Sequence, residues 1–361
     1  MPESKPSPEL SVLIVSYHSQ SDLAQCLPSL YAQSYTDFEV VLVDNAPHDG
    51  TGKWLEATYP DVSVISNADN TGYAGGNNLG LDHVRGQWVL FLNPDTKLHE
   101  GALEQLVRTT KANPKALVNS KLLNPDGTVN ASGLVMHYTG ISTCRGLNEA
   151  SSEYTGLEPV PLLSGAAFAT SREVLADIGG FQASYFMYLE DIELSLRAKL
   201  CGYDILCDND AIITHDYVQN LTARKFYYLE RNRLLTLLII AQQTTLWKMS
   251  PALLLTEAAT WSYAALKGLP YLYARWRALL WFVHHPEGWR PLRAAMQAKR
   301  RHRDNVWLQD ALVGLPFEQL MDSEALAGTL DSLTWPVYKF LRPHRSSSQA
   351  PQAPRPSSSS S

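Results

Sequence analysis

The sequence lacks an apolar run long enough to cross a bilayer as a helix. Such a helix needs roughly 18 to 20 consecutive apolar residues, and no stretch of that length among the 361 residues is free of charged and strongly polar side chains. We therefore expect no transmembrane helix. The first residues also lack the basic and apolar segments of a secretory signal, so we expect a cytoplasmic protein.

Cysteine is scarce, and an excess of positive charge is missing. The four cysteines (Cys26, Cys144, Cys201 and Cys207) show no CxxC spacing, so we expect reduced thiols rather than a disulfide framework. The formal net charge of −6 argues against bulk attraction to nucleic acid, and we expect no nucleic-acid partner. We find no internal repeat.

Short runs rich in β-branched residues alternate with helix-length segments in the first part of the chain. Four of these runs predict strands, at Ser11–Ser16, Glu39–Asp44, Val62–Ser66 and Trp88–Leu92. Strands spaced by helices are typical of βαβ units around a buried parallel sheet. The sequence therefore predicts an α/β fold.

The pattern changes after about residue 115. An NPDG turn at Asn124–Gly127 and an apolar run at Leu162–Thr170 precede a predicted helix from Leu189 to Leu200, which Gly202 ends. From Lys225 onward the spacing predicts helices.

The first of these C-terminal helices is expected to place its apolar residues on one face. Those residues are Leu234, Leu237, Leu238 and Ala241. The Ser- and Pro-rich ends, residues 1–9 and 346–361, are expected to be disordered, because they hold too few apolar residues to offset the entropy of ordering.

Polar residues follow each of the four predicted strands. Because ligands bind beyond the carboxyl ends of parallel strands, these residues are candidates for a nucleotide pocket. They are Ser16 and Tyr17, Asp44 and Asn45, then Asn70, Gly72, Tyr73, Gly76, Asn77 and Asn78 of the segment NTGYAGGNN, and Asn93. A carboxylate such as Asp44 can accept hydrogen bonds from a base or a ribose, and glycine lets backbone approach a bulky ligand. Asp44 could equally cap the next helix.

The glycine-rich segment is not a dinucleotide-binding fingerprint. It does not read GxGxxG, and it follows the third predicted strand rather than the first. Both differences argue against a dehydrogenase.

Asp95 follows Pro94 at the end of the fourth predicted strand. Its hard carboxylate oxygen suits Mg²⁺ or Mn²⁺ held jointly with diphosphate oxygens. The alternative is a turn of the Asx type, in which the side chain binds only nearby backbone. His215 ends the run AIITH and could complete a metal site, although a single histidine is more often structural.

An acidic pair, Glu190 and Asp191, opens the helix predicted from Leu189. These acids could simply stabilise the first turn, where the helix dipole favours negative charge. Four aromatic residues come just before them, at Phe181, Tyr185, Phe186 and Tyr188. Since a partly desolvated carboxylate is a stronger base, the pair is also a candidate general base.

Several motifs, taken in order, are similar to those of family 2 glycosyltransferases of the rhamnosyltransferase-like branch. They are SVLIVSYHS, VVLVDN, NTGYAGGNN, LFLNPD, SGAAFA, GGF, YLEDIELSLRAKLCGY and ITHDY. The resemblance covers about residues 10 to 240, and its order along the chain is more specific than any one motif. It implies a GT-A fold, a mostly parallel twisted sheet flanked by helices, with a nucleotide-sugar donor and a divalent cation, Mg²⁺ or Mn²⁺.

The resemblance also implies roles for individual residues. Asp44 would contact the donor base, Asp95 would bind the metal at the family's DxD position, and Asp191, with Glu190 beside it, would be the general base. His215 would join the metal, and Tyr188, Arg231 and Asn232 would lie on the acceptor side. Two positions depart from the family pattern: the DxD position reads Asn93-Pro94-Asp95, which loses one carboxylate, and His18 stands where the family usually has asparagine.

These roles describe an inverting transfer. A metal at Asp95 would stabilise the charge that develops on the leaving diphosphate, while Asp191 would take the proton of the attacking hydroxyl on the opposite face. One displacement with one base gives inversion. By resemblance the acceptor would be a glycan or a lipid-linked saccharide of cell-envelope polysaccharide synthesis, and the donor dTDP-rhamnose.

The expected organisation is a catalytic domain over residues 10–225 followed by a helical region over residues 226–345. The nucleotide-binding half spans about residues 10–115 and the acceptor half about residues 116–225. The helical region is rich in Trp, Tyr and Leu up to His285, and a basic stretch follows, with Arg290, Arg293, Lys299, Arg300, Arg301 and Arg303. Such a region suits the inner leaflet of a membrane, an interface in a homo-oligomer, or packing on the catalytic core.

Two other functions compete with a glycosyltransferase. An inactive nucleotide-sugar-binding scaffold of the same fold would have no need for the acids Asp95 and Asp191. A processive polysaccharide synthase ordinarily has spanning helices and a QxxRW motif, and the sequence contains neither.

Overall fold

The computed structural model describes residues 7–217, 220–316, 319 and 324–343. Most of the two ends expected to be disordered, residues 1–6 and 346–361, lies outside these ranges. The chain divides into two compact units. The first comprises Met1–Gly133, Gly146–Leu194 and Tyr203–Val218, and the second comprises Leu134–Arg145, Ser195–Gly202 and Gln219–Ser361.

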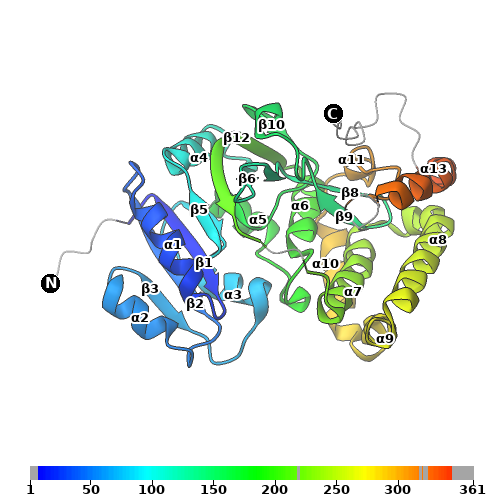
Figure 1. The fold of residues 1–361 in the computed structure, drawn as a ribbon, viewed down its shortest axis with the longest axis horizontal. Helices are drawn as coiled ribbons and strands as arrows, with labels where there is room; N and C mark the ends of the chain where they lie inside the picture. Colours follow the sequence, from blue (N-terminus) through cyan, green and yellow to red (C-terminus); the bar gives the residue numbers. More distant parts are fainter. Residues whose placement is uncertain (1–6, 218–219, 317–318, 320–323, 344–361) are drawn as a thin grey trace. The chain divides into compact units, whose positions relative to one another are not determined.

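The first unit is built on one mixed β-sheet. Its strands are β1 (Leu10–Ser16), β2 (Phe38–Asp44), β3 (Ser63–Ser66), β4 (Trp88–Leu92), β5 (Thr96–Leu98), β6 (Ala116–Leu123), β7 (Val129–Ala131), β10 (Leu157–Pro159), β11 (Ala167–Ser171) and β12 (Asp204–His215). Their order is β10-β12-β6-β11-β4-β1-β2-β3, with β5 paired to β12 and β7 to β6 (Figure 1). The fold is therefore α/β, as expected.

The four predicted strands form the parallel part of this sheet. β1 lies between β2 and β4 and is parallel to both, and β2 is parallel to β3. β11 runs antiparallel between β4 and β6. The run Val40–Val43 in β2 is buried throughout, as a strand covered on both faces requires.

Helices flank the sheet and complete the first unit. They are α1 (Gln20–Tyr31), α2 (Thr51–Thr58), α3 (Gly72–Leu81), α4 (Ala102–Ala112), α5 (Arg172–Ile178) and the start of α6 (Glu190–Leu200), with single 3₁₀ turns η1 (Ser151–Glu153) and η2 (Ala183–Tyr185). The predicted helix at Leu189–Leu200 is confirmed, and Gly202 follows its end with a φ of 87°. The NPDG turn between β6 and β7 is also confirmed, since the Gly127 N–H donates to Asn124 O.

Helix α3 lies unusually close to the sheet because two of its glycines face the strands. A Cβ added to Gly76 would lie 2.7 Å from Val15 Cγ1, and one added to Gly80 would lie 2.2 Å from Leu13 Cδ1. Both distances are shorter than any normal contact, so larger residues would push the helix away from β1. This packing sets the height of the glycine-rich segment above the strand ends.

The second unit is mostly helical. It contains the hairpin of β8 (Leu134–Met136) and β9 (Ser142–Cys144), the end of α6, and the helices α7 (Ala223–Ile240), α8 (Gln243–Lys267), α9 (Leu269–His284), α10 (Arg290–Lys299), α11 (Asn305–Leu308) and α13 (Glu324–Leu341), with a 3₁₀ turn η3 (Pro286–Gly288). A helical C-terminal region was expected and is confirmed. None of the helices described is long and apolar enough to span a membrane.

The prediction of a single apolar face on α7 is wrong. Leu235, Ile239 and Ile240 are buried as completely as the predicted Leu237, whereas Leu234 and Leu238 are only partly buried. The reason is that the helix is covered on several sides, with α9 and α10 among its neighbours. A helix enclosed in this way needs apolar residues around most of its circumference.

Four ion pairs between two arginines and two glutamates join three helices of the second unit. Arg233 on α7 lies 2.9 Å from Glu230 Oε2 and 2.6 Å from Glu257 Oε1 on α8. Arg275 on α9 contacts the same two acids. Burial lowers the pKa of Arg275 to about 10, so the arginine still carries its charge at neutral pH. Two cations and two anions compensate one another here, which makes burial of the group tolerable.

Candidate functional site

Three neighbouring parallel strands of the first unit end at the same edge of the sheet. Ser16, the last residue of β1, is in register with Asp44, the last residue of β2. Asn93 comes directly after β4, which lies on the other side of β1. Since this edge is where open α/β sheets bind ligands, the structure brings together three of the residues expected to contact the nucleotide.

Buried polar atoms without hydrogen-bond partners gather at this edge. Among the described residues, no partner is present for Ser16 Oγ, Asp44 Oδ2, Asn93 Oδ1, Asp95 Oδ1 or His215 Nε2. Buried polar atoms in folded proteins nearly always have partners, because leaving one unpaired costs about 1–3 kcal/mol. Five such atoms near the strand ends indicate a place where a polar ligand supplies the missing partners.

One carboxylate oxygen of Asp44 binds backbone in a turn, and contact of the other with a nucleotide stays a prediction. Its Oδ1 accepts a hydrogen bond of 2.9 Å from Ala46 N, as in a turn. Its Oδ2 is one of the unpartnered atoms. Burial raises the pKa of Asp44, so a donor group hydrogen-bonded to Oδ2 would favour the ionised form.

Asn45, which follows β2, and Asn77 and Asn78 of the glycine-rich segment bind the protein's own backbone. Asn45 Nδ2 donates to Gly72 O, and Asn77 Nδ2 donates to Tyr73 O. Asn78 forms two bonds with the backbone of Phe181, donating to its carbonyl at 2.7 Å and accepting from its N–H at 2.8 Å. These amides therefore position α3, and contact between them and a nucleotide stays a prediction.

The start of α3 is tied to the segment that precedes the acidic pair. Asn70 Oδ1 accepts a bond from Gly72 N at 2.8 Å. Gly72 has a φ of 70°, and a Cβ there would lie 2.2 Å from Phe186 O. Ala74 N donates to this same carbonyl. Only glycine satisfies both the backbone conformation and the close approach.

Asp95 and His215 are brought together by the pairing of β5 with β12. This pairing places His215 opposite Thr96, the residue after Asp95, and Asp95 Oδ1 lies 3.4 Å from His215 Nε2. Their side chains are 25% and 8% exposed. The two predicted metal ligands are therefore adjacent in the structure.

The proton on His215 is placed by Asn130. Asn130 Nδ2 donates to Asn124 Oδ1, so Asn130 Oδ1 is the atom that faces His215 Nδ1, at 3.3 Å. An amide oxygen only accepts, so Nδ1 carries the proton and neutral His215 directs the lone pair of Nε2 toward Asp95. Two acceptor atoms then face each other, and a second proton or a cation must lie between them.

A divalent cation fits this arrangement chemically. Carboxylate oxygen and imidazole nitrogen both ligate Mn²⁺, and carboxylate oxygen is the preferred protein ligand of Mg²⁺. The described part of the chain contains no group of three or more His, Cys, Asp or Glu residues that could hold a metal ion. Asp95 and His215 would therefore hold the ion together with ligand oxygens and water.

Strained backbone precedes the acidic pair. Phe186, Tyr188 and Leu189 have φ values of 65°, 69° and 62°, in the left-handed region that residues with side chains seldom adopt. Strain of this kind persists where surrounding structure enforces it, and it is concentrated at functional sites. The turn sets the direction in which α6 begins with Glu190 and Asp191.

Asp191 is held by two backbone N–H groups. Its Oδ2 accepts from Gly165 N at 2.9 Å, and its Oδ1 accepts from Ile192 N at 2.8 Å. Glu190 is 6% exposed, and its Oε2 has no partner in the described ranges. Donors favour an ionised carboxyl, so Asp191 is the member of the pair better suited to carry the charge.

Burial raises the pKa of both acids. For Glu190 burial is the larger cause, and the charge of Asp191 adds to it. For Asp191 burial is opposed by the N–H groups of Gly165 and Ile192. Of the two acids, Glu190 is therefore the one that binds a proton more readily.

Tyr73 connects the acidic pair with the metal-ligand pair. Its hydroxyl donates to Gly165 O at 2.6 Å, and Gly165 N binds Asp191. Burial raises the pKa of Tyr73, and the charges of Glu190, Asp191 and Asp95 raise it further. The charges of both pairs therefore act on Tyr73, which indicates that the acidic pair and the metal-ligand pair lie near each other in the first unit.

The remaining predicted residues have different surroundings. Tyr17 is 51% exposed and packs edge-on against His18, whose Nδ1 lies 3.0 Å from Asp49 Oδ2. Tyr188 belongs to the strained turn. Arg231 and Asn232 are on α7 in the second unit, where Arg231 donates two hydrogen bonds to Asn232 Oδ1. The acceptor-side roles of Tyr188, Arg231 and Asn232 stay predictions.

Sequence reasoning missed three residues of this site. Gly165 binds Asp191, and Asn130 orients His215. Asp22 on α1 is the third: burial raises its pKa, and the charges of Asp95 and Asp216 add to the effect. The SGAAFA motif includes Gly165 and offered the one signal available. No local pattern identifies Asn130 or Asp22, because the site residues they act on, His215 and Asp95, lie more than 70 residues away in the sequence.

Comparison with known proteins gives a family match for part of the chain. Residues 11–179 match the model named Glycosyl transferase family 2. The chain is 30% identical over 200 residues to the low-salt glycan biosynthesis hexosyltransferase Agl10 of Haloferax volcanii. That alignment covers 53% of this chain and 62% of the other, so the chain spans less than two thirds of this relative's length.

A second relative and a solved structure extend the comparison. The N-acetylglucosaminyl-diphospho-decaprenol L-rhamnosyltransferase of Mycobacterium tuberculosis is 26% identical over 267 residues, covering 67% of this chain and 87% of that protein. The crystal structure of GalNAc-T7 with UDP, GalNAc and Mn²⁺ superposes with a TM-score of 0.55 at 16% identity, over 78% of this chain and 57% of that one. This likeness confirms the expected GT-A fold.

Replacing Asn130 with alanine should weaken metal binding. Without the acceptor at Nδ1, the proton of His215 can move to Nε2, and the nitrogen that faces Asp95 is no longer free to bind a cation. Changes of this kind typically cost about 10- to 100-fold in metal affinity. Titration of Mn²⁺ in the presence of a nucleoside diphosphate, followed by the electron paramagnetic resonance of free Mn²⁺, measures the effect. Asn113→Ala, at the end of α4, is the control, and equal affinities in both variants would refute the role of Asn130.

Proposed function

We propose that this chain, whose residues 11–179 match the model of glycosyl transferase family 2, transfers a sugar from a nucleotide diphosphate to an acceptor hydroxyl with inversion. One observation carries the proposal. The candidate base Asp191 binds Gly165, and the carbonyl of the next residue, Ala166, accepts from the N–H of Asn93, two residues before Asp95. Base and metal ligand are thus connected through one short segment.

The nucleotide would bind at the strand ends. Ser16 Oγ, Asp44 Oδ2 and Asn93 Oδ1 lack partners among the residues described, and base and ribose groups of a nucleotide supply both donors and acceptors. The half-exposed ring of Tyr17 lies just beyond β1, where it can pack against the base. Asn45, Asn77 and Asn78 would act indirectly by holding α3 in place.

The diphosphate would share a divalent cation with Asp95 and His215. When bound, such an ion supplies Lewis-acid stabilisation of the charge on the leaving diphosphate. The imidazole of His215 favours Mn²⁺ over Mg²⁺, because Mg²⁺ prefers oxygen ligands. The solved structure of GalNAc-T7 contains UDP and Mn²⁺, which is consistent with this assignment.

Asp191 would receive the proton of the acceptor hydroxyl. Its two backbone donors keep it ionised, and its burial makes it more basic than an exposed aspartate. Glu190, whose pKa is raised by burial and by the charge of Asp191, would be the member of the pair that binds a proton first. A single base on the side opposite the leaving group gives inversion at the anomeric carbon.

The donor and acceptor classes come from the relatives. The Mycobacterium protein is named for transfer of L-rhamnose to N-acetylglucosaminyl-diphospho-decaprenol, and this chain covers most of its length. We therefore propose dTDP-rhamnose as donor and a lipid-linked diphosphate saccharide of cell-envelope polysaccharide synthesis as acceptor. Arg231, Asn232 and Tyr188 would lie on the acceptor side.

Transfer should depend on Asp191. With dTDP-rhamnose, Mn²⁺ and a prenyl-diphosphate N-acetylglucosamine, the protein should release nucleoside diphosphate in step with acceptor glycosylation. Asp191→Asn should lower kcat by roughly 10²- to 10⁴-fold, while donor affinity changes little, because the proposed nucleotide contacts are at the strand ends. Glu190→Gln is the matched control and should keep most of the turnover. An Asp191→Asn enzyme with near-normal turnover would remove Asp191 from the base role.

A panel of UDP-, GDP- and dTDP-sugars extends this assay to the donor. Transfer from another sugar nucleotide alone would correct the donor and keep the reaction. Absence of transfer and of diphosphate release with every donor would favour the non-catalytic scaffold.

When the pH is lowered, the activity should be lost at a higher pH than it would be if the base were an aspartate with an ordinary pKa. The base works only when ionised, and burial raises the pKa of Asp191. The acid limb of kcat should therefore lie above the usual aspartate range. Glu190→Gln should retain this limb, because the pKa shift of Asp191 comes mainly from burial. If Glu190→Gln abolished the limb, Glu190 would be the titrating base.

We propose further that α8 and α9 lie on an anionic inner leaflet. Large apolar side chains are exposed along both helices, at Trp247, Leu254, Leu266, Leu269, Tyr273, Trp276 and Val283. The exposed charged residues between 243 and 285 are Lys248, Lys267 and Arg277, all cations, while the acid Glu257 is paired with arginines. Aromatic side chains beside cations suit the headgroup region.

Vesicle flotation tests this location. The double change Leu269→Ser and Trp276→Ser should lower the fraction bound to vesicles of phosphatidylglycerol and phosphatidylcholine by several-fold, because it removes exposed apolar area. Leu157→Ser, at an exposed site in the first unit, should leave binding unchanged. If the protein is instead a dimer in solution and the double variant a monomer, the surface is an oligomer interface.

A further inference from the structure

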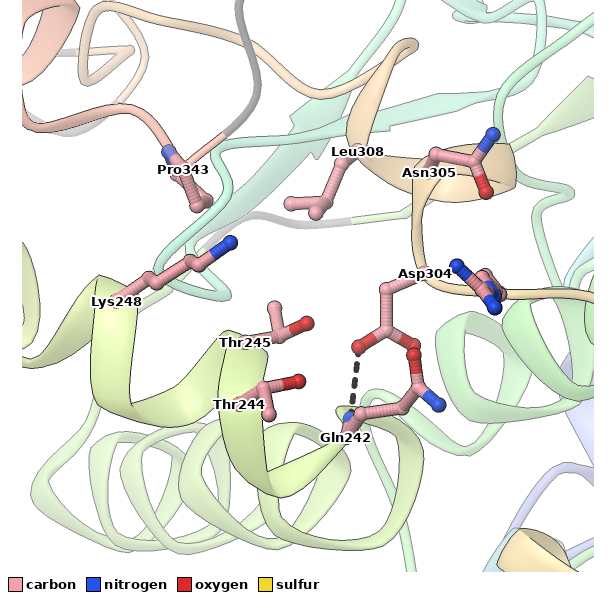
Figure 2. Close-up of a pocket in the computed structure, with 9 residues that line it drawn as sticks. Gln242, Thr244, Thr245, Lys248, Asp304, Asn305, Leu308 and Pro343 are labelled. Atoms are coloured by element: carbon pink, nitrogen blue, oxygen red, sulfur yellow. Dashed lines mark hydrogen bonds between the residues drawn. The ribbon is translucent and has the colours of Figure 1, made fainter.

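A polar cavity lies within the second unit, at the N-terminal end of α8. Its volume is about 320 Å³. It is lined by the first turns of α8 and by the segment around α11, with Pro343 closing one side (Figure 2). None of its lining residues takes part in the proposed transfer site. The cavity therefore needs an explanation of its own.

The end of α8 that faces the cavity is uncapped. The N-cap residue Gln242 makes no capping hydrogen bond with its side chain. Within the part of the chain that is described, the backbone N–H groups of Gln243, Thr244 and Thr245 have no acceptor. The first turn of a helix carries free N–H groups and partial positive charge, so this 25-residue helix presents both to the cavity.

Thr245 gives a second, independent indication of a ligand. The residue is only 8% exposed, and its hydroxyl forms no hydrogen bond with any residue the structure describes. In Figure 2 the hydroxyl groups of Thr244 and Thr245 point from α8 into the cavity. On a residue this buried, a hydroxyl that binds no described protein group is available to donate to a bound acceptor.

The charged groups around the cavity leave a net positive charge. Lys248, one turn further along α8, extends its ammonium group over the cavity (Figure 2). Arg303 also lines the cavity, and neither cation forms an ion pair with a described residue. The acid in the wall, Asp304, is already neutralised by Arg300 and accepts from Gln242 N at 2.7 Å.

We propose that this cavity binds a phosphate group, as a phosphomonoester or a diphosphate. Its donors are the N–H groups of the first turn of α8, the hydroxyls of Thr244 and Thr245, the ammonium of Lys248 and the guanidinium of Arg303. A tetrahedral dianion uses several donors from different directions, and a helix N-terminus beside lysine and arginine is suited to it. The phosphate belongs either to a small soluble anion or to a lipid headgroup.

Calorimetry and thermal unfolding of the full chain test the site with two soluble probes, inorganic phosphate and pyrophosphate. We expect saturable binding of at least one probe at constant ionic strength. Lys248→Gln and Thr245→Val should each weaken it about tenfold, because each removes one charge-assisted hydrogen bond. Thr245→Ser should bind the probe about as tightly as the unchanged protein, since it keeps the hydroxyl. Lys267→Gln, an exposed lysine at the other end of α8, is the matched control.

Flotation with vesicles that contain phosphatidic acid distinguishes the lipid source. Binding of the soluble probes identifies a free anion. Binding to these vesicles alone, reduced in Lys248→Gln and Thr245→Val but not in Lys115→Gln, a change of an exposed lysine in the first unit, identifies a headgroup. Unchanged affinity for a nucleoside diphosphate in the same variants would separate this cavity from the transfer site. The proposal is overturned if neither probe nor vesicle binds, or if both cavity variants bind as tightly as the control.

Discussion

The hydrogen bond from Gly165 N–H to Asp191 Oδ2 holds the candidate site together. The carbonyl of Gly165 also accepts from Tyr73, and the carbonyl of Ala166 accepts from Asn93 N. Two adjacent residues thus join α3, the end of β4 and the start of α6. A Cβ at position 165 would lie 3.3–3.4 Å from Asp191 and from the Tyr73 hydroxyl. Any larger residue would therefore shift the base relative to the strand ends.

Local sequence patterns were sufficient for the parallel part of the sheet and its edge. The strands β1, β2 and β4 follow from runs of β-branched and apolar residues. Ser16, Asp44 and Asn93 are notable simply because they end those runs. The topology then brings these residues together, because neighbouring parallel strands end at the same edge of the sheet. The acids of α6 could also be located in advance, although their burial and raised pKa could not.

Contacts between distant segments explain what local patterns could not predict. Asn78 was expected near the nucleotide, yet its amide binds Phe181, 103 residues away. His215 could be paired with Asp95 only by family resemblance, because β5 is three residues long and has no recognisable pattern. The single apolar face expected for α7 was wrong for a related reason: the neighbours that cover the helix come from later in the chain.

Unpartnered buried atoms are informative only when several converge on one place. Arg275 has two nitrogens without hydrogen-bond partners among the described residues, yet its charge is compensated by Glu230 and Glu257. No ligand is needed there. At the sheet edge, by contrast, five such atoms from separate segments lie near one another, and two of them are acceptors that face each other at 3.4 Å. Either a second proton on His215 or a bound cation satisfies that contact, and a ligand would supply partners for the other three atoms.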